Sequence, residues 1–120
     1  MPTLVNLKAV SLTQIRDLLG AKAFCGEDLS PQVEHVVAAD LMSDVLIQSK
    51  RGMLLLTSLA SPQVIRTALV AGLCGVVFVQ GRTPDESVLA LARERKIPLL
   101  GTPLPMFEAV GLLYMAMSGR

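Results

Sequence analysis

Two apolar runs in the middle of the chain are continuous rather than alternating. They are residues 53–57 (MLLLT) and 75–79 (GVVFV), and between them lies an amphipathic segment that begins at Ser61-Pro62. A strand that is apolar at every position is covered on both faces, which is typical of a parallel sheet. Serine is favoured at a helix N-cap, and proline is tolerated at the first helical position. Residues 50–82 are therefore predicted to form a strand, a helix and a second strand at the centre of the fold.

The same pattern predicts further elements on both sides of this unit. Segments with apolar residues at helical spacing alternate with short apolar segments, and turn or capping residues separate them. Two helices are predicted before this unit: one is capped by Ser11 or Thr13 and ends at residue 19, and the other spans 41–48 and is capped by Asp40. The helix within the unit runs from Pro62 to Gly72. Two more follow it: one is capped by Thr83 and begins at Pro84, and the last begins at Pro105. The predicted strands are a short one around Leu4, Val5 and Leu7, then 21–25, 33–39, 53–57, 75–79 and 97–100.

Alternating helices and strands predict an α/β fold. We expect a three-layer α/β/α domain with a mostly parallel sheet of about five strands and with helices on both faces. The 120 residues contain no repeat, no low-complexity tract and no composition shift that would mark a boundary. Residues 1–120 are therefore predicted to form a single domain.

The last predicted helix is apolar on every side. From Met106 to Met117 its only charged residue is Glu108. A helix of this kind is either buried or in contact with a partner. We expect a homodimer, with this helix or the helix at 41–48 near the interface.

Composition excludes several classes of function. The net charge is +1 and aromatic residues make up 3% of the chain, so the basic stripe and stacking aromatics of a nucleic-acid binder are not expected. No signal peptide is evident, and the uncharged apolar stretch at 70–79 is too short to span a bilayer. We expect a cytoplasmic protein with neither a nucleic-acid nor a membrane partner.

Metal and cofactor chemistry is not expected either. Cys25 and Cys74 are far apart in apolar surroundings, neither belongs to a C-x-x-C pair, and His35 is the only histidine, so no zinc pattern is present. Two reduced, buried thiols are the expectation, with a disulfide or a reactive thiol as the alternative. The chain contains neither a phosphate-binding G-x-x-x-x-G-K-[ST] loop nor a G-x-G-x-x-G fingerprint.

An ordered set of short motifs nevertheless resembles a known family. The motifs are 40–45 (DLMSDV), 50–52 (KRG), 75–79 (GVVFV) with 81–84 (GRTP), 97–104 (IPLLGTPL), and Phe107-Glu108 followed by Gly111, Leu113 and Tyr114. Together they cover nearly the whole chain and resemble the DRTGG domain family. The resemblance implies an accessory, dimer-forming and non-catalytic domain, of the kind that accompanies CBS domains in regulated pyrophosphatases and occurs in some phosphotransacetylases. It also implies similarity to the N-terminal domain of HPr kinase/phosphorylase.

The chain departs from the family pattern at two places. The region that corresponds to the pentapeptide after which the family is named, residues 32–36, reads QVEHV and lacks both glycines. Thr57 is followed by Ser58-Leu59-Ala60, where the family tends to carry a Thr-His-like pair.

The loops after the parallel strands are the candidate ligand site. Open α/β sheets bind ligands at the carboxyl ends of their strands, and Arg82 is a fixed cation suited to phosphate or carboxylate. A small anionic metabolite or a nucleotide is the predicted ligand; the alternative is that these residues are ordinary caps and turns with one solvated arginine. The candidate residues are Thr57, Ser58, Ser61, Gln80, Gly81, Arg82 and Thr102, with Gly101 beside the last.

Two other groups of residues carry possible chemistry. Asp40 and Asp44 are four apart on a predicted helix and so share a face, where they would bind Mg²⁺ or share a proton, or serve as an N-cap and a first-turn acid. Adjacent strand residues point to opposite faces, so Glu34 and His35 form no dyad, and a structural or surface role is favoured for His35.

Three functions remain open on these grounds. The leading hypothesis is a non-catalytic regulatory or interaction domain that dimerises and senses a small anionic ligand. The second is a small phosphotransfer or hydrolytic enzyme using Asp40, Asp44, His35 and Arg82, which requires these residues to converge. The third is a structural subunit of a larger metabolic complex, whose last helix contacts a different protein.

Overall fold

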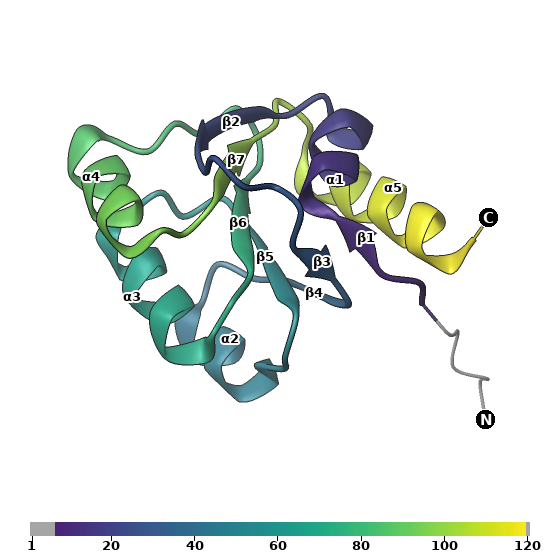
Figure 1. Ribbon diagram of the computed structural model, residues 1–120, viewed down its shortest axis with the longest axis horizontal. Helices are drawn as coiled ribbons and strands as arrows, with labels where there is room; N and C mark the ends of the chain where they lie inside the picture. The colour runs from purple at the N-terminus through teal and green to yellow at the C-terminus, as the bar shows by residue number, and fades with distance from the viewer. Residues whose placement is uncertain (1–6, 120) are drawn as a thin grey trace.

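A five-stranded sheet runs through the centre of the molecule in the order β2-β7-β6-β5-β4 (Figure 1). The computed structural model describes residues 7–119 of the chain. The strands are β2 (Lys22–Cys25), β4 (His35–Ala38), β5 (Met53–Thr57), β6 (Gly75–Phe78) and β7 (Leu99–Gly101). Strands β4, β5, β6 and β7 are parallel, and β2 adds an antiparallel edge strand beside β7. The predicted mostly parallel sheet of about five strands is confirmed.

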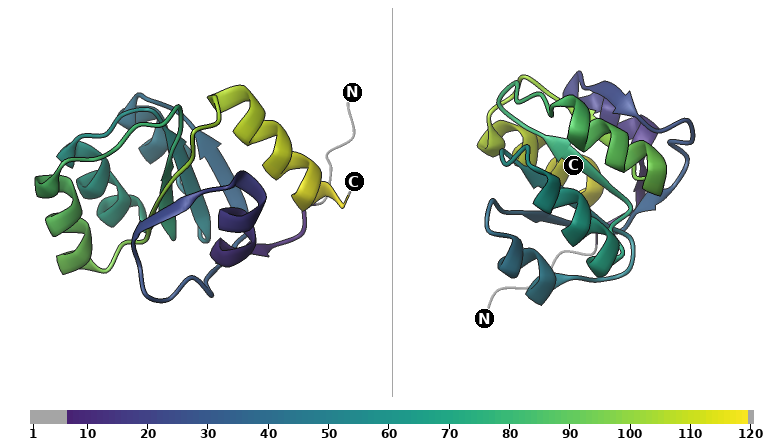
Figure 2. Two further views of the ribbon diagram at one scale, coloured as in Figure 1. Left: turned by 90° about the horizontal axis from the view of Figure 1, so that it is seen from above. Right: turned by 90° about the vertical axis from the view of Figure 1, so that its left-hand side faces the viewer.

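Helices cover both faces of this sheet, as Figures 1 and 2 show. Helices α2 (Met42–Gln48), α3 (Pro62–Ala71) and α4 (Glu86–Arg95) pack on one face. Helices α1 (Leu12–Leu19) and α5 (Met106–Ser118) pack on the other. The three-layer α/β/α arrangement predicted from the alternating pattern is therefore present.

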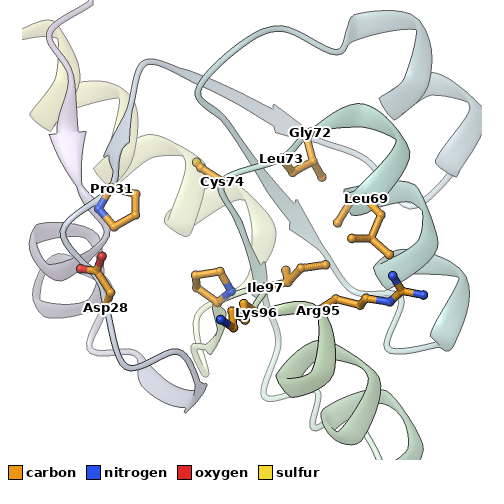
Figure 3. A pocket seen from close by; sticks show the side chains of 11 residues that line it. Asp28, Pro31, Leu69, Gly72, Leu73, Cys74, Arg95, Lys96 and Ile97 are labelled. Atoms are coloured by element: carbon orange, nitrogen blue, oxygen red, sulfur yellow. The ribbon is translucent and has the colours of Figure 1, made fainter.

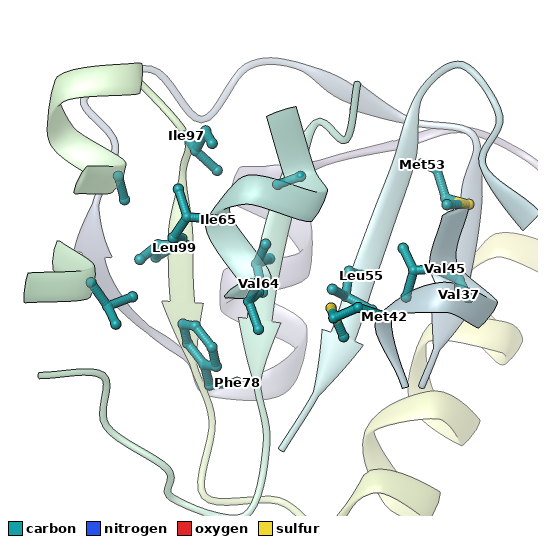
Figure 4. Close-up of a cluster of buried hydrophobic side chains, with 14 residues drawn as sticks. Val37, Met42, Val45, Met53, Leu55, Val64, Ile65, Phe78, Ile97 and Leu99 are labelled. Atoms are coloured by element: carbon teal, nitrogen blue, oxygen red, sulfur yellow. The ribbon is translucent and has the colours of Figure 1, made fainter. Parts of the chain in front are cut away.

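The continuous apolar strands explain why both faces need cover. Successive strand side chains point to opposite faces, so Leu55 of β5 joins the core under α2, α3 and α4, whereas Leu54 and Leu56 join the core under α1 and α5. Figure 4 shows the first of these cores, in which Phe78 and Leu99 lie beside the side chains of α3. Each face buries apolar side chains because the strands carry no polar side to expose.

The predicted strand at 33–39 is divided in two. Strand β3 (Gln32–Val33) pairs with β1 (Val10–Ser11) in a separate two-stranded sheet, whereas β4 pairs with β5 in the main sheet. The break falls at Glu34, whose N–H donates to the carbonyl oxygen of Gly52 at 2.8 Å. At this residue the chain leaves one sheet and joins the other. The alternation of apolar and polar residues along the sequence does not show which strand each half pairs with. Of the short strand predicted near the N-terminus, Leu4 and Val5 lie outside the described residues, and Leu7 is not in a strand.

Two predicted helix caps are wrong, whereas Ser11 and Ser61 occupy the N-cap positions predicted for them. Ser11 caps α1 in a capping box with Gln14. The α4 N-cap is Asp85, whose carboxylate accepts from the backbone N–H of Val88 at 3.2 Å, and not Thr83. The α2 N-cap is Leu41, because the carboxylate of Asp40 is used elsewhere. Helices α2 and α4 therefore begin one and two residues later than predicted, whereas α3 begins at Pro62 as predicted.

Helix faces follow the predicted periodicity with exceptions. Val64, Ile65 and Ala68 of α3 are buried at helical spacing, and the polar Thr67 between them is buried too. In α5, one side is buried in the core and Phe107 on another side is 87% exposed. Within residues 7–119, no helix combines the length and the apolar character that crossing a membrane requires.

Candidate functional site

The carboxyl ends of four parallel strands meet at one edge of the sheet, and the predicted loops meet there with them. The backbone N–H of Val79 donates to the carbonyl oxygen of Thr57 at 3.0 Å, and that of Thr102 donates to the carbonyl oxygen of Phe78 at 2.9 Å. The loops after β5, β6 and β7 are thus in direct contact. We call this region the strand-end edge.

Asp40 joins two of the strands at this edge. Its Oδ1 accepts from the hydroxyl of Thr57 at 2.8 Å and from the backbone N–H of Ser58 at 2.7 Å, and its Oδ2 accepts from the hydroxyl of Ser58 at 2.6 Å. Hydrogen bonds to a carboxylate are stronger than those between neutral groups. Asp40 therefore ties the segment after β4 to the end of β5.

These contacts favour the charged form of Asp40. The hydrogen bond from the Ser58 hydroxyl lowers the pKa of Asp40, and the Ser58 backbone N–H, the Thr57 hydroxyl and the positive charge of Arg82 lower it further, against a smaller opposing effect of burial. The charge of Arg82 thus acts on the same carboxylate.

Two of the predicted site hydroxyls are used inside the protein. Thr57 is fully buried, and besides donating to Asp40 its hydroxyl oxygen accepts from the backbone N–H of Leu59 at 3.1 Å. Thr102 is also buried; its hydroxyl donates to the carbonyl oxygen of Leu19 at 2.8 Å and accepts from the N–H of Leu104 at 3.2 Å. Both side chains hold loops in place.

The turn after β6 directs its backbone inward and its cation outward. Gln80 and Gly81 adopt left-handed backbone angles, with φ of 60° and 69°. Their N–H groups donate to the carbonyl oxygens of Leu104 at 2.8 Å and Thr102 at 3.0 Å. The side chain of Arg82 is exposed and, among the described residues, forms no salt bridge. Arg82 is therefore the group that this turn offers to a ligand. Ser61, the remaining predicted residue, occupies the N-cap of α3 without a capping hydrogen bond from its side chain.

The residues of the enzyme hypothesis do not all converge, because His35 lies far from Asp40. His35 begins β4 and Asp40 follows the end of that strand, which separates them by about 16 Å at roughly 3.3 Å per residue. His35 instead lines a cavity of about 200 Å³ near Gln48 and Lys50, at the opposite edge. Residues 7–119 contain no group of three acidic, histidine or cysteine side chains placed to hold a metal ion.

This chain is similar in sequence to a known domain family. The family model of the DRTGG domain matches residues 14–116. The chain belongs to the DRTGG domain family. No curated protein matches it.

A solved structure supports the same fold for this DRTGG domain. It contains the CBS and DRTGG domains of the regulatory region of Clostridium perfringens pyrophosphatase, in complex with the activator diadenosine tetraphosphate. The similarity has a TM-score of 0.73 at 21% sequence identity and covers 89% of this chain and 47% of that one. The chain thus spans about half the length of this structural relative.

One cavity in this DRTGG domain lies away from the strand-end edge. It has a volume of about 490 Å³ and lies at the amino ends of β6 and β7, beside the last residues of α3 and α4 (Figure 3). None of the predicted site residues lines it. Its lining residues are Asp28, Pro31, Ala68, Leu69, Gly72, Leu73, Cys74, Arg95, Lys96, Ile97 and Pro98. Sequence reasoning missed it because three connections far apart in the chain form its walls.

The cysteines of this DRTGG domain are free thiols. Burial raises the pKa of Cys74 to about 11, and its thiol donates to the carbonyl oxygen of Met53 at 3.3 Å. Burial likewise raises the pKa of Cys25, whose thiol donates to the carbonyl oxygen of Ile97. Since the thiolate is the nucleophilic form, neither cysteine is activated for chemistry at neutral pH.

Proposed function

We propose that this DRTGG domain is a regulatory module that binds a small anionic metabolite or a nucleotide at the strand-end edge. The observation that carries the proposal is the exposed side chain of Arg82, whose positive charge acts on the same Asp40 carboxylate that accepts hydrogen bonds from Ser58. Parallel α/β sheets bind ligands at this edge. The related regulatory region, which contains CBS and DRTGG domains, is complexed with the polyanion diadenosine tetraphosphate, and this supports an anionic ligand here.

Arginine suits this role better than the backbone of the loop does. The N–H groups of Gln80 and Gly81 are occupied, so a phosphate cannot use them as it would in a glycine-rich phosphate loop. A guanidinium offers two parallel donors to a phosphate or a carboxylate. The proposal therefore assigns the main charge interaction to Arg82 and assigns no catalytic step to any residue.

The test is a titration with diadenosine tetraphosphate, ATP and inorganic phosphate, followed by calorimetry and thermal unfolding. Ligand at about 100 times its Kd adds about 2.7 kcal/mol to the free energy of unfolding. We expect Arg82→Gln to weaken binding about tenfold or more, as loss of a charge-assisted contact does. Arg51→Gln is the matched control, because Arg51 is also exposed but lies in the turn before β5, at the opposite edge. Equal binding by both variants, or no binding by the unaltered protein, would refute the proposal.

We also propose that the domain dimerises through α5. Phe107 is 87% exposed, and Tyr114 and Met115 are exposed on the same side of the helix. Gly111 lies between them, and a Cβ added there would meet no atom within 4 Å. Glycine inside a helix costs about 1 kcal/mol relative to alanine, and close approach of a second backbone would offset this cost. Two α5 helices that cross at Gly111 about a two-fold axis would bury the same side chains on both subunits.

A structural role in a larger complex is the second candidate function. On the opposite face of the sheet from α5, Ile47 of α2 is 82% exposed and Val70 of α3 is 78% exposed. Exposed apolar residues of this kind mark protein contacts when they are grouped, and α2 and α3 pack against each other. A dimer formed through α5 leaves this second surface open for another protein. Absence of ligand binding in the titration above would favour this function.

A further inference from the structure

The hydrogen-bond donors at the strand-end edge already hold an anion. The backbone N–H of Ser58 and the hydroxyls of Ser58 and Thr57 all donate to the carboxylate of Asp40, at 2.6 to 2.8 Å. Arg82 acts on the same carboxylate from the neighbouring loop. A backbone N–H, a hydroxyl and a guanidinium are the groups with which proteins bind phosphate or carboxylate ligands. Asp40 therefore occupies the position that such a ligand would take.

We infer that Asp40 is an internal competitor of the ligand, so that a phosphate group gains the donors of Ser58 only by displacing the Asp40 carboxylate. This inference rests on the proposed function, because there is no competition unless anions bind beside Arg82. Two anions cannot share these donors, since like charges at close range repel each other. The carboxylate of Asp40 is at the surface, so its side chain has room to leave without opening the core.

Displacement of Asp40 would also carry a signal. Its carboxylate is the tie between the segment after β4 and the end of β5. Leu41, the next residue, is the N-cap of α2 and has no side-chain capping bond of its own. Release of Asp40 would therefore loosen the start of α2, whose Ile47 belongs to the second exposed apolar surface. Ligand occupancy at the strand-end edge would reach that surface through α2.

The test compares the binding of inorganic phosphate to the unaltered protein and to Asp40→Asn. The variant keeps the size of the side chain and removes the competing charge, so we expect binding to become about tenfold tighter, as loss of a charge repulsion at this range gives. Asp44→Asn is the matched control: it removes the same charge from the first turn of α2, where no hydrogen bond to the Asp44 side chain is present among the described residues. We expect it to bind phosphate as the unaltered protein does.

The outcomes separate this inference from the proposed function. Unaltered protein that binds phosphate while Asp40→Asn binds equally or more weakly would overturn the inference and leave the proposed function standing. An equal gain in Asp40→Asn and Asp44→Asn would also overturn it, because the general charge and not the position of Asp40 would then matter. If neither phosphate nor diadenosine tetraphosphate binds any of these proteins, the proposed function fails and the inference fails with it.

A second measurement covers the case in which Asp40→Asn does not fold. Phosphate is titrated into the unaltered protein while NMR follows the Ser58 amide and the side-chain carboxyl carbon of Asp40. We expect both signals to move with the same Kd, since the ligand takes the donor as the carboxylate leaves it. Movement of the Ser58 amide with an unchanged Asp40 carboxyl signal would overturn the inference.

Discussion

The carboxylate of Asp40 accepts three hydrogen bonds while it remains at the surface. Its neighbour Leu41 takes the N-cap of α2 with φ of −100° and ψ of 112°. Asp40 is thereby left outside the helix, where its side chain reaches Thr57 and Ser58. The same side chain thus contributes to the stability of the folded chain and to the electrostatics of the candidate site.

The stability contribution of Asp40 should disappear in acid. Its pKa is lowered in the folded protein, mainly by the Ser58 hydroxyl, so its stabilising effect is complete above the unfolded-state pKa of about 3.9 and is lost as the pH falls through the lower folded-state value. We expect Asp40→Asn to reduce the free energy of unfolding by about 1 kcal/mol at pH 7. Urea unfolding at pH 7 and at a series of pH values below 4 measures this difference.

The pKa values of Asp28 and Asp85 are also lowered. Both residues are present in the unaltered protein and in Asp40→Asn, so their contributions to the free energy of unfolding cancel in the comparison. A difference between the two proteins that stays constant down to pH 2 would contradict this account.

At the scale of elements, the antiparallel edge strand β2 shapes the end of β7. Gly101 was predicted to lie in a loop but is the last residue of β7, paired with Lys22 of β2. A Cβ at Gly101 would clash with the ring of Phe24, which is a residue of β2. The φ of Gly101 is not in the left-handed region, so the requirement for glycine here is one of space and not of backbone angle.

Gly101→Ala should therefore be destabilising. The added methyl group forces the Phe24 ring out of its position over β7, and overpacking of this kind costs about 1–3 kcal/mol. Gly111→Ala is the control, because its Cβ enters open space in the middle of α5 and alanine is favoured over glycine in helices by about 1 kcal/mol. Urea unfolding, at a protein concentration too low for dimers, should show opposite signs for the two variants. Equal effects would rule out the close contact with Phe24.

At the scale of the whole molecule, the three-layer architecture places two exposed apolar surfaces on opposite faces of the sheet. One is on α5, around Phe107, and the other is on α2 and α3, around Ile47 and Val70. A single two-fold interface uses the same surface on both subunits and therefore occupies only one of these two. A dimer formed through α5, as proposed above, would leave the exposed apolar side chains of α2 and α3 free to contact another protein.

The dimer interface is tested by placing one charge on each surface in turn. We expect the unaltered protein to sediment as a dimer at micromolar concentration and Phe107→Glu to sediment as a monomer, because a buried unpaired charge at an interface is strongly unfavourable. Ile47→Glu is the matched control, since Ile47 is similarly exposed but lies on the other face; this variant should remain a dimer. Sedimentation of the unaltered protein as a monomer, or dissociation of Ile47→Glu alone, would refute the assignment to α5.

Much of the architecture follows from the sequence by itself. The runs at 53–57 and 75–79 have no polar side, so the sheet that they form must be covered on both faces. The apolar residues at helical spacing between and around these runs indicate the helices that cover it. The cap at Ser11 and the helix ends predicted at residue 19 and at Gly72 are equally local, and their positions agree with the structure. These features depend on backbone preferences and on periodicity within a few residues, which a single chain displays directly.

Only the tertiary structure decided the features that depend on partners distant in the chain. Asp40 looked like a helix cap because nothing in the sequence indicates that Thr57 and Ser58 would lie beside it. The division of the strand at Glu34 depends on which strand each half meets, and the cavity beside Cys74 depends on three separate connections. Hydrogen-bond partners and cavities arise when distant segments meet, so the predicted ligand edge could be located from the sequence, but the anion that already occupies it could not.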